Sequence, residues 1–273
     1  MGLRTSLSLM VRLLDAHSGS YAEVRPARPG LLRVCVHVPG TAGMMDITWL
    51  RVPLVADLLF RTAELRDMQV LTVLAFAGQP AAQLETFERA ADALGIHPAA
   101  ARTSLPEAHA SPGGPIDVHL ISQGADMDGG HGALVTRVGA AQFRRAGDHH
   151  AAAGDVLAGP ADPLAVRLAL MSVSYHQPAD LTEDVLASAD ETVAHWRRQV
   201  AHWAESPSRP MPARISEAAG TAFGDLDTVS ALGLLRDLIL DAEVQAGAKF
   251  ETFVYADRIL GLDLPRDIGR TSR

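Results

Sequence analysis

Polar side chains that could bind a ligand or a metal ion follow two buried strands predicted for this chain. The first strand covers residues 31–38 and the second covers residues 115–121. Binding sites in parallel α/β sheets form beyond the carboxyl ends of the strands, so segments 38–46 and 119–131 are expected to face each other. The candidates for lining a pocket there are His37, Thr41, Asp46, Trp49, His119, Asp126 and His131.

The elements that must position these residues follow a strand–helix–strand order. Apolar residues recur at helical spacing over residues 49–67, and Pro53 suits the first turn of such a helix. A second buried strand is predicted over residues 68–76, and an amphipathic helix over residues 80–95. Such an opening predicts an α/β fold with a Rossmann-like, doubly wound parallel sheet.

The pattern becomes less regular after this opening and then wholly helical. Residues 102–114 are turn-rich and predict a loop, residues 132–145 predict a helix, and residues 146–160 predict irregular structure. Further helices are predicted at 162–175, 180–204, 210–222, 226–246 and 248–261. We therefore predict a Rossmann-like domain over residues 1–160 and a helical bundle domain over residues 161–273.

Composition narrows the class of protein. The 273 residues carry a formal net charge of -8, and 48% of them are hydrophobic. This balance is typical of a cytoplasmic globular protein, and the abundant alanine and arginine suggest a bacterial source. No apolar run reaches the roughly 18 residues of a membrane span, and the first residues lack the pattern of a signal peptide. The acidic balance, without a basic stripe, argues against binding of tRNA or other nucleic acids.

Two rare residue types limit the chemistry further. Cys35 is the single cysteine, so the chain can form neither an internal disulfide nor a metal site built from several cysteines. Lys249 is the single lysine. Any phosphate clamp before that position must therefore use arginine, histidine or backbone amides.

Several segments carry a resemblance to a known family. Residues 33–39, RVCVHVP, resemble a strand with the pattern R-(aliphatic)-Y-V-C-G-P, and residues 46–59 continue in register into the following helix. Residues 162–170, DPLAVRLAL, resemble a D-P-x-A-(I/L)-R-L-A-L helix, and residues 224–228 resemble the D-L-D/N-T segment that follows it. These patterns resemble the cysteinyl-tRNA synthetase and mycothiol ligase family of class I aminoacyl-tRNA synthetase-like proteins. The resemblance implies the class I catalytic fold followed by a helical bundle.

The positions that the family uses for ATP chemistry hold other residues here. The resemblance implies that two histidines of the family's HIGH motif stabilise charge on the ATP phosphates, and this chain has Asp46 and Trp49 at those positions. The family's KMSKS loop supplies lysines, whereas residues 147–154 contain none. A long connective insertion of the family is missing between Pro106 and Pro115. The chain is thus a truncated and degenerate relative, and no ATP cofactor is expected.

The family's zinc site is altered as well. The resemblance implies a first thiolate at the position of His37, a second in the missing insertion, and a histidine matched by His131. Cys35 lies two residues before His37, so both side chains should point to the same face of the strand. Catalytic zinc needs at least three protein ligands, which Cys35, His37 and His131 could supply with generous geometry. We favour instead a packed core cysteine and two ordinary histidines, and predict no metal cofactor.

Two functions from different classes remain. In the first, the chain is a pseudoenzyme that has lost the HIGH, KMSKS and zinc motifs and is retained to bind a small molecule or a partner. In the second, it is a repurposed ligase or transferase that acts on an aminoacyl or other pre-activated substrate. A nucleotide or amino-acid derivative is the expected small ligand. An exposed face of His195, Trp196, His202 and Trp203 is the candidate surface for a protein partner or a homodimer.

Overall fold

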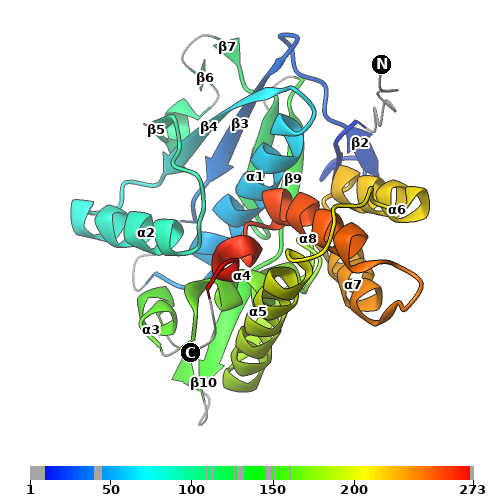
Figure 1. Cartoon of the computed structure of the whole chain (residues 1–273). Coiled ribbons are helices and arrows are strands. Elements are labelled where there is room, and N and C mark those ends of the chain that lie inside the picture. Colours follow the sequence, from blue (N-terminus) through cyan, green and yellow to red (C-terminus); the bar gives the residue numbers. More distant parts are fainter. Residues whose placement is uncertain are drawn as a thin grey trace.

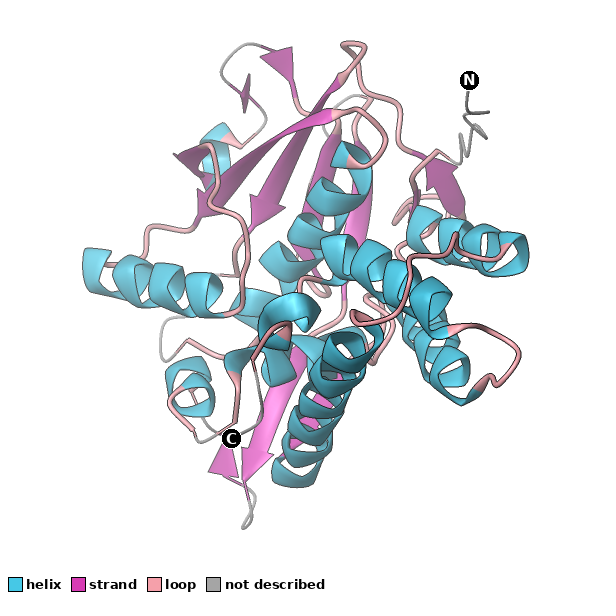
Figure 2. Ribbon diagram, viewed as in Figure 1, coloured by secondary structure: helices cyan, strands magenta, loops and turns pink. Residues whose placement is uncertain are grey.

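The fold is an α/β sheet domain joined to a set of helices, shown in Figure 1. The structure is a computed structural model, and it describes residues 10–39, 45–108, 110–111, 114–125, 127, 132–145, 149–150, 152–159 and 161–270. Figure 2 shows that strands form the upper left and centre of the molecule, while long helices form its lower right.

The central sheet has five parallel strands in the order β5-β4-β3-β8-β9. The strands are β3 (Leu31–His37), β4 (Gln69–Phe76), β5 (Ala101–Ser104), β8 (Val118–Ser122) and β9 (Leu134–Val138). The chain builds outward from β3 to β5 and then returns to pair β8 on the other side of β3. This reversal creates a topological switch point between β3 and β8, and it confirms the predicted α/β, Rossmann-like sheet.

Two helices cover one face of this sheet. They are α1 (Thr48–Glu64), which lies in front of the strands in Figure 1, and α2 (Ala81–Ala93), which packs beside α1. Alternate β3 residues Leu32, Val34 and Val36 point toward α1 and join one large hydrophobic core. The intervening Arg33, Cys35 and His37 therefore point to the opposite face.

Two segments differ from their predicted structure. The predicted loop at 102–114 contains the edge strand β5, and the predicted helix at 132–145 forms β9 and β10 (Ala141–Arg145) instead. The run of residues 134–138 is rich in β-branched residues, and Gly139 then breaks the pattern before a second strand. Periodicity alone does not separate a short apolar helix from two short strands.

A second, smaller sheet crosses the boundary predicted at residue 160. Strand β10 precedes that position, and β12 (Ala179–Thr182) follows it, yet the two strands pair in parallel. Strand β11 (His149–His150) pairs with β10 on its other edge. One hydrophobic cluster also includes residues from both halves of the chain, and the division into two domains at residue 160 stays a prediction.

The second half is mainly helical, as expected. Its helices are α4 (Pro163–Met171), α5 (Glu183–Trp203), α6 (Ala213–Gly224), α7 (Thr228–Leu240) and α8 (Ala246–Leu260). Shorter elements are β1 (Arg12–Leu14), β2 (Tyr21–Glu23), η1 (Leu105–Glu107), β6 (Ala110–Ser111), β7 (Gly114–Pro115), α3 (Ala153–Leu157) and η2 (Leu264–Asp267). None of the helices in the described ranges combines the length and the apolar character needed to cross a bilayer.

The tryptophans of α5 belong to the core, which corrects the expected Trp-His face. Trp196 and Trp203 are buried, and their rings pack edge-on against Phe253 of α8. His195 and His202 are exposed on the same helix. The helix therefore turns its tryptophans inward and its histidines to solvent, so the two residue types do not share one surface.

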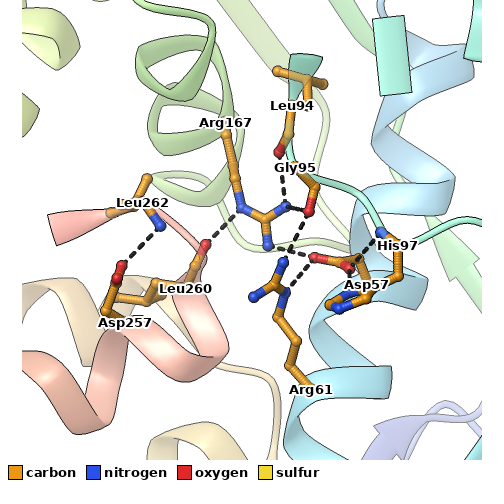
Figure 3. A network of polar contacts seen from close by, with 9 residues as sticks. All are labelled: Asp57, Arg61, Leu94, Gly95, His97, Arg167, Asp257, Leu260 and Leu262. Carbon is orange, nitrogen blue, oxygen red and sulfur yellow. Dashed lines mark hydrogen bonds and ion pairs between the residues drawn. The ribbon is translucent and has the colours of Figure 1, made fainter. Parts of the chain in front are cut away.

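A buried polar network joins the sheet domain to the helices, as Figure 3 shows. The Asp57 carboxylate on α1 accepts hydrogen bonds from Arg61 at 2.8 Å and from Arg167 on α4 at 2.5 Å. It also accepts one from the backbone N–H of His97, and it lies 2.6 Å from the imidazole Nδ1 of that residue. Arg167 is fully buried and donates onward to the carbonyls of Leu94 and Leu260. Since a buried charge is stable only when paired, Asp57 and Arg167 depend on each other.

A second buried arginine holds the start of the smaller sheet. The guanidinium of Arg51 donates to the carbonyl oxygens of Gly139, Ala140 and Gln177 at 3.1, 2.9 and 2.7 Å. Burial lowers the pKa of Arg51 to about 10. Arg51 is thus a structural clamp between α1 and the chain segments that flank β10 and β12.

Candidate functional site

Two histidines meet at the switch point between β3 and β8. Strand pairing places Cys35 opposite His119, and His37 follows at the carboxyl end of β3. The Nε2 atom of His37 lies 3.0 Å from the Nδ1 atom of His119, and the ring centroids are 5.2 Å apart in an edge-on arrangement. His119 is buried and His37 is partly exposed. His37 therefore lies at the edge of the sheet where parallel α/β folds bind ligands, while His119 lies behind it, within β8.

Cys35 completes a cluster of three possible metal ligands. Its side chain points to the same sheet face as His37, as the strand alternation predicted. One ligand atom each from Cys35, His37 and His119 lies within 4.8 Å of the other two. The thiol is fully buried beside Ala75, Ala108 and Ile116, and this burial raises the pKa of Cys35 to about 12.

The amino terminus of α1 carries a carboxylate. The Asp46 side chain accepts a hydrogen bond of 2.9 Å from the Thr48 backbone N–H in the first helical turn. The Thr48 hydroxyl in turn exchanges two hydrogen bonds with the backbone of Ala141 in β10. A negative side chain at this end of a helix stabilises the helix dipole and takes the place where an anion would bind.

The structure describes four of the seven predicted pocket residues. It brings His37 and His119 into contact and places Asp46 on the surface at the start of α1. Trp49 has no exposed area and packs in the main core, so its burial removes it from the surface available to a ligand. Thr41, Asp126 and His131 lie outside the described residues.

The pairing of His119 with Cys35 and His37 was not predicted, although the sequence held a signal for it. His119 follows Val118 in a buried strand and alternates with Val118 and Leu120, which face the main core. That alternation alone places His119 on the opposite face. The register between β3 and β8 was the missing information.

A separate cavity of about 280 Å³ lies on the other face of the sheet. Leu74 of β4 lines it. Val73, which pairs with Cys35, alternates with Leu74 along the strand, so Cys35 and Leu74 point to opposite faces of the sheet. Its remaining wall comes from α1, α2 and the segment before β5, and includes Phe60, Phe87 and His97. The His97 ring lies against Phe60 and is held by Asp57, so this wall is fixed by the network in Figure 3.

The sheet order, the switch point and the appended helices make a Rossmann-like α/β fold with a helical second half. In agreement, the chain superposes on a solved arginyl-tRNA synthetase-like protein from Campylobacter jejuni with a TM-score of 0.52. The match covers 85% of this chain and 89% of that chain at 8% sequence identity, so it shows the fold alone. No protein-family model matches the sequence.

Sequence comparison relates the chain distantly to mycothiol ligases, which confirms the resemblance. It is 32% identical over 107 residues to an L-cysteine:1D-myo-inositol 2-amino-2-deoxy-alpha-D-glucopyranoside ligase of Corynebacterium jeikeium, covering 38% of this chain. It is 36% identical over 93 residues to the ligase of that name from Thermobispora bispora, covering 29% of this chain. The matched segments span 26% and 23% of the length of these two relatives.

The residues at the site fit one of the two groups that the resemblance implies. Zinc binds sulfur and imidazole nitrogen, and the cluster of Cys35, His37 and His119 offers one sulfur and two nitrogens at close range. That donor set fits the metal. The triphosphate of ATP does not fit the start of α1, because Asp46 places a carboxylate against the helix amides there. Like charges at about 4 Å repel by roughly 1–4 kcal/mol at a protein surface.

Proposed function

We propose that this chain uses a ligase-related fold to bind a small molecule or a protein partner, and that it does not catalyse ATP-dependent ligation. The observation that supports this most is the hydrogen bond from the Thr48 amide to the Asp46 carboxylate. A helix amino terminus that already carries a carboxylate is a poor site for phosphate. In this proposal the chain is a pseudoenzyme, and its switch point between β3 and β8 is the binding site.

Two buried cations support the same proposal. Arg51 is the fourth residue of α1, and its guanidinium donates hydrogen bonds to backbone carbonyls. Lys249 is buried on α8, where its Nζ donates to the carbonyl of Ile239 and lies 5.7 Å from the Trp203 ring. Both side chains stabilise the fold, so neither is placed to neutralise a triphosphate.

Thermal unfolding with ATP and Mg²⁺, AMP, or cysteine tests this proposal. A ligand at 100 times its dissociation constant stabilises a protein by about 2.7 kcal/mol, so a functional ATP site would be visible. We expect no stabilisation of this chain by ATP and no ATP–pyrophosphate exchange with cysteine. The Thermobispora bispora ligase, measured beside it, is the positive control. Stabilisation by ATP together with exchange activity would overturn the proposal.

A repurposed ligase or transferase is the second candidate function. The observation that favours it is the pair of His37 and His119 at the switch point, since two imidazoles 3.0 Å apart can hold or move a proton. Such an enzyme would accept a substrate that is already activated. Stabilisation by a non-hydrolysable cysteinyl-adenylate mimic, without stabilisation by ATP, would favour this candidate over the pseudoenzyme.

A further inference from the structure

We propose that Cys35, His37 and His119 bind one zinc ion. The three residues share one face of two adjacent strands, and their ligand atoms lie within 4.8 Å of one another. One thiolate and two imidazoles suit zinc and disfavour Mg²⁺ or Ca²⁺, which prefer oxygen ligands. This inference goes beyond the proposed function, because zinc can bind here whether or not any catalysis occurs.

The distances require only a small adjustment. Zinc–nitrogen bonds of about 2.0–2.1 Å and zinc–sulfur bonds of about 2.3 Å put the donors of a tetrahedral site roughly 3.3–3.7 Å apart. The two imidazole nitrogens are 3.0 Å apart and the whole set lies within 4.8 Å. Zinc binding in this proposal therefore needs side-chain adjustments of about 1 Å at Cys35 and His37.

The strands hold the three ligands in fixed register. Cys35 and His37 are separated by one residue of β3, and His119 is the residue of β8 that pairs with Cys35. Parallel pairing on both sides of β3 restrains these backbones. Ligands carried on strands are positioned more accurately than ligands carried on loops, which favours a preorganised metal site.

Zinc binding at this site releases one proton. The buried Cys35 thiol binds as a thiolate and releases its proton to solvent, while both imidazoles bind in their neutral form. Three protein ligands leave a fourth position for water, as in zinc sites that accept a further ligand. His37 is the partly exposed member of the cluster, so access is from its side.

This ligand set is not the one implied by the family resemblance. Only the position of His37 is shared with that set, in which a thiolate stands there. Here the sulfur has moved two residues back to Cys35, and the neighbouring strand contributes His119. The alternative for the same residues is a hydrogen-bonded histidine pair beside an inert thiol.

Zinc content and cobalt spectroscopy of the full chain separate these two cases. The protein is purified, freed of metal with a chelator, and titrated with Zn²⁺ or Co²⁺ alone. We expect one Zn²⁺ per chain after dialysis. With Co²⁺ we expect a ligand-field spectrum typical of four-coordinate geometry and a thiolate-to-cobalt charge-transfer band. No retained zinc and no charge-transfer band would overturn the proposal.

Variants then assign the ligands. His37→Gln and His119→Gln are each expected to weaken zinc binding on the order of 100-fold, and Cys35→Ser to abolish the charge-transfer band. His195→Gln, which alters an exposed histidine on α5, is the matched control and should bind as the unmodified chain does. Circular dichroism of each metal-free variant checks that it is folded, and His37→Gln is the mildest change because His37 is partly exposed. Unchanged affinity in folded His37→Gln and His119→Gln would exclude these residues as ligands.

Discussion

Asp57→Asn is expected to lower the free energy of unfolding by about 3–5 kcal/mol, which is the usual effect of breaking a buried ion pair from one side. The substitution keeps the size of the side chain but removes the charge that balances Arg167, whose side chain has no exposed area. It also turns one of the two acceptor oxygens into an NH2 donor, so either the two arginines or His97 lose their acceptor. Urea unfolding at neutral pH measures the change. Small domains have only about 5–15 kcal/mol in total, so the variant would be marginal.

Two controls make this expectation specific. Asp92→Asn changes an exposed carboxylate on α2 and should alter the unfolding free energy by no more than about 0.5 kcal/mol. The double variant Asp57→Leu with Arg167→Met replaces the pair by apolar side chains and should recover part of the loss. A loss below about 1 kcal/mol in Asp57→Asn would mean that solvent or backbone carbonyls neutralise Arg167 without the carboxylate.

The same carboxylate should make the protein sensitive to acid. Burial alone would raise the pKa of Asp57, but hydrogen bonding to His97 and the charges of Arg167 and Arg61 outweigh burial and hold this pKa far below its ordinary value. In the unfolded chain the carboxyl titrates near its reference pKa of about 3.9. The stabilisation is therefore complete above that pH and is lost as the pH falls further. Urea unfolding at pH 7 and at successively lower pH should show Asp57→Asn and the unmodified chain converging in acid.

This network could not be predicted from the sequence, although the helix that carries it could. Residues 49–67 showed helical spacing, and Asp57 interrupted an otherwise apolar stripe. Its main partner, Arg167, lies 110 residues away on α4. A pairing over that distance depends on how the helices pack against the sheet, and periodicity carries no information about such packing.

The strand–helix–strand opening was predictable because its local signals agree with its burial. Residues 31–38 are β-branched and apolar and form β3, a strand buried on both faces. Residues 132–145 lacked that agreement, since an Ala- and Val-rich run interrupted by Gly139 suits a helix as well as two short strands. What decided the outcome was the parallel pairing of β10 with β12, a contact between residues almost forty positions apart.

The candidate site was predictable only in part. Strand alternation placed Cys35 and His37 on one face, and the rule for parallel sheets placed His37 and His119 at one edge. Contact between the three side chains required the β3–β8 register, which places Cys35 opposite His119. Sequence periodicity contains no register between strands that lie eighty residues apart.

Gly139→Ala is expected to destabilise the protein by about 1–3 kcal/mol or more, because added volume at this position meets backbone. A Cβ at Gly139 would overlap with the carbonyl group of Gln177 and would lie 2.8 Å from the nitrogen of Pro178. Gly139 also donates its N–H to the carbonyl of Tyr175 and accepts from Arg51. Relief of the overlap must therefore separate the β9–β10 connection from the segment before β12. Urea unfolding of the variant measures the effect.

Gly233→Ala is the matched control for this overlap. Gly233 lies inside α7, and a Cβ there meets nothing within 4 Å. Alanine is the better helix former by roughly 0.5–1 kcal/mol, so the same chemical change should raise the unfolding free energy at Gly233 and lower it at Gly139. Opposite signs would identify close approach of backbone as the cause. A Gly139→Ala variant as stable as the unmodified chain would mean that the segments flanking β10 and β12 can separate at little cost. In that case the Arg51 clamp could not be what holds α1 to the smaller sheet.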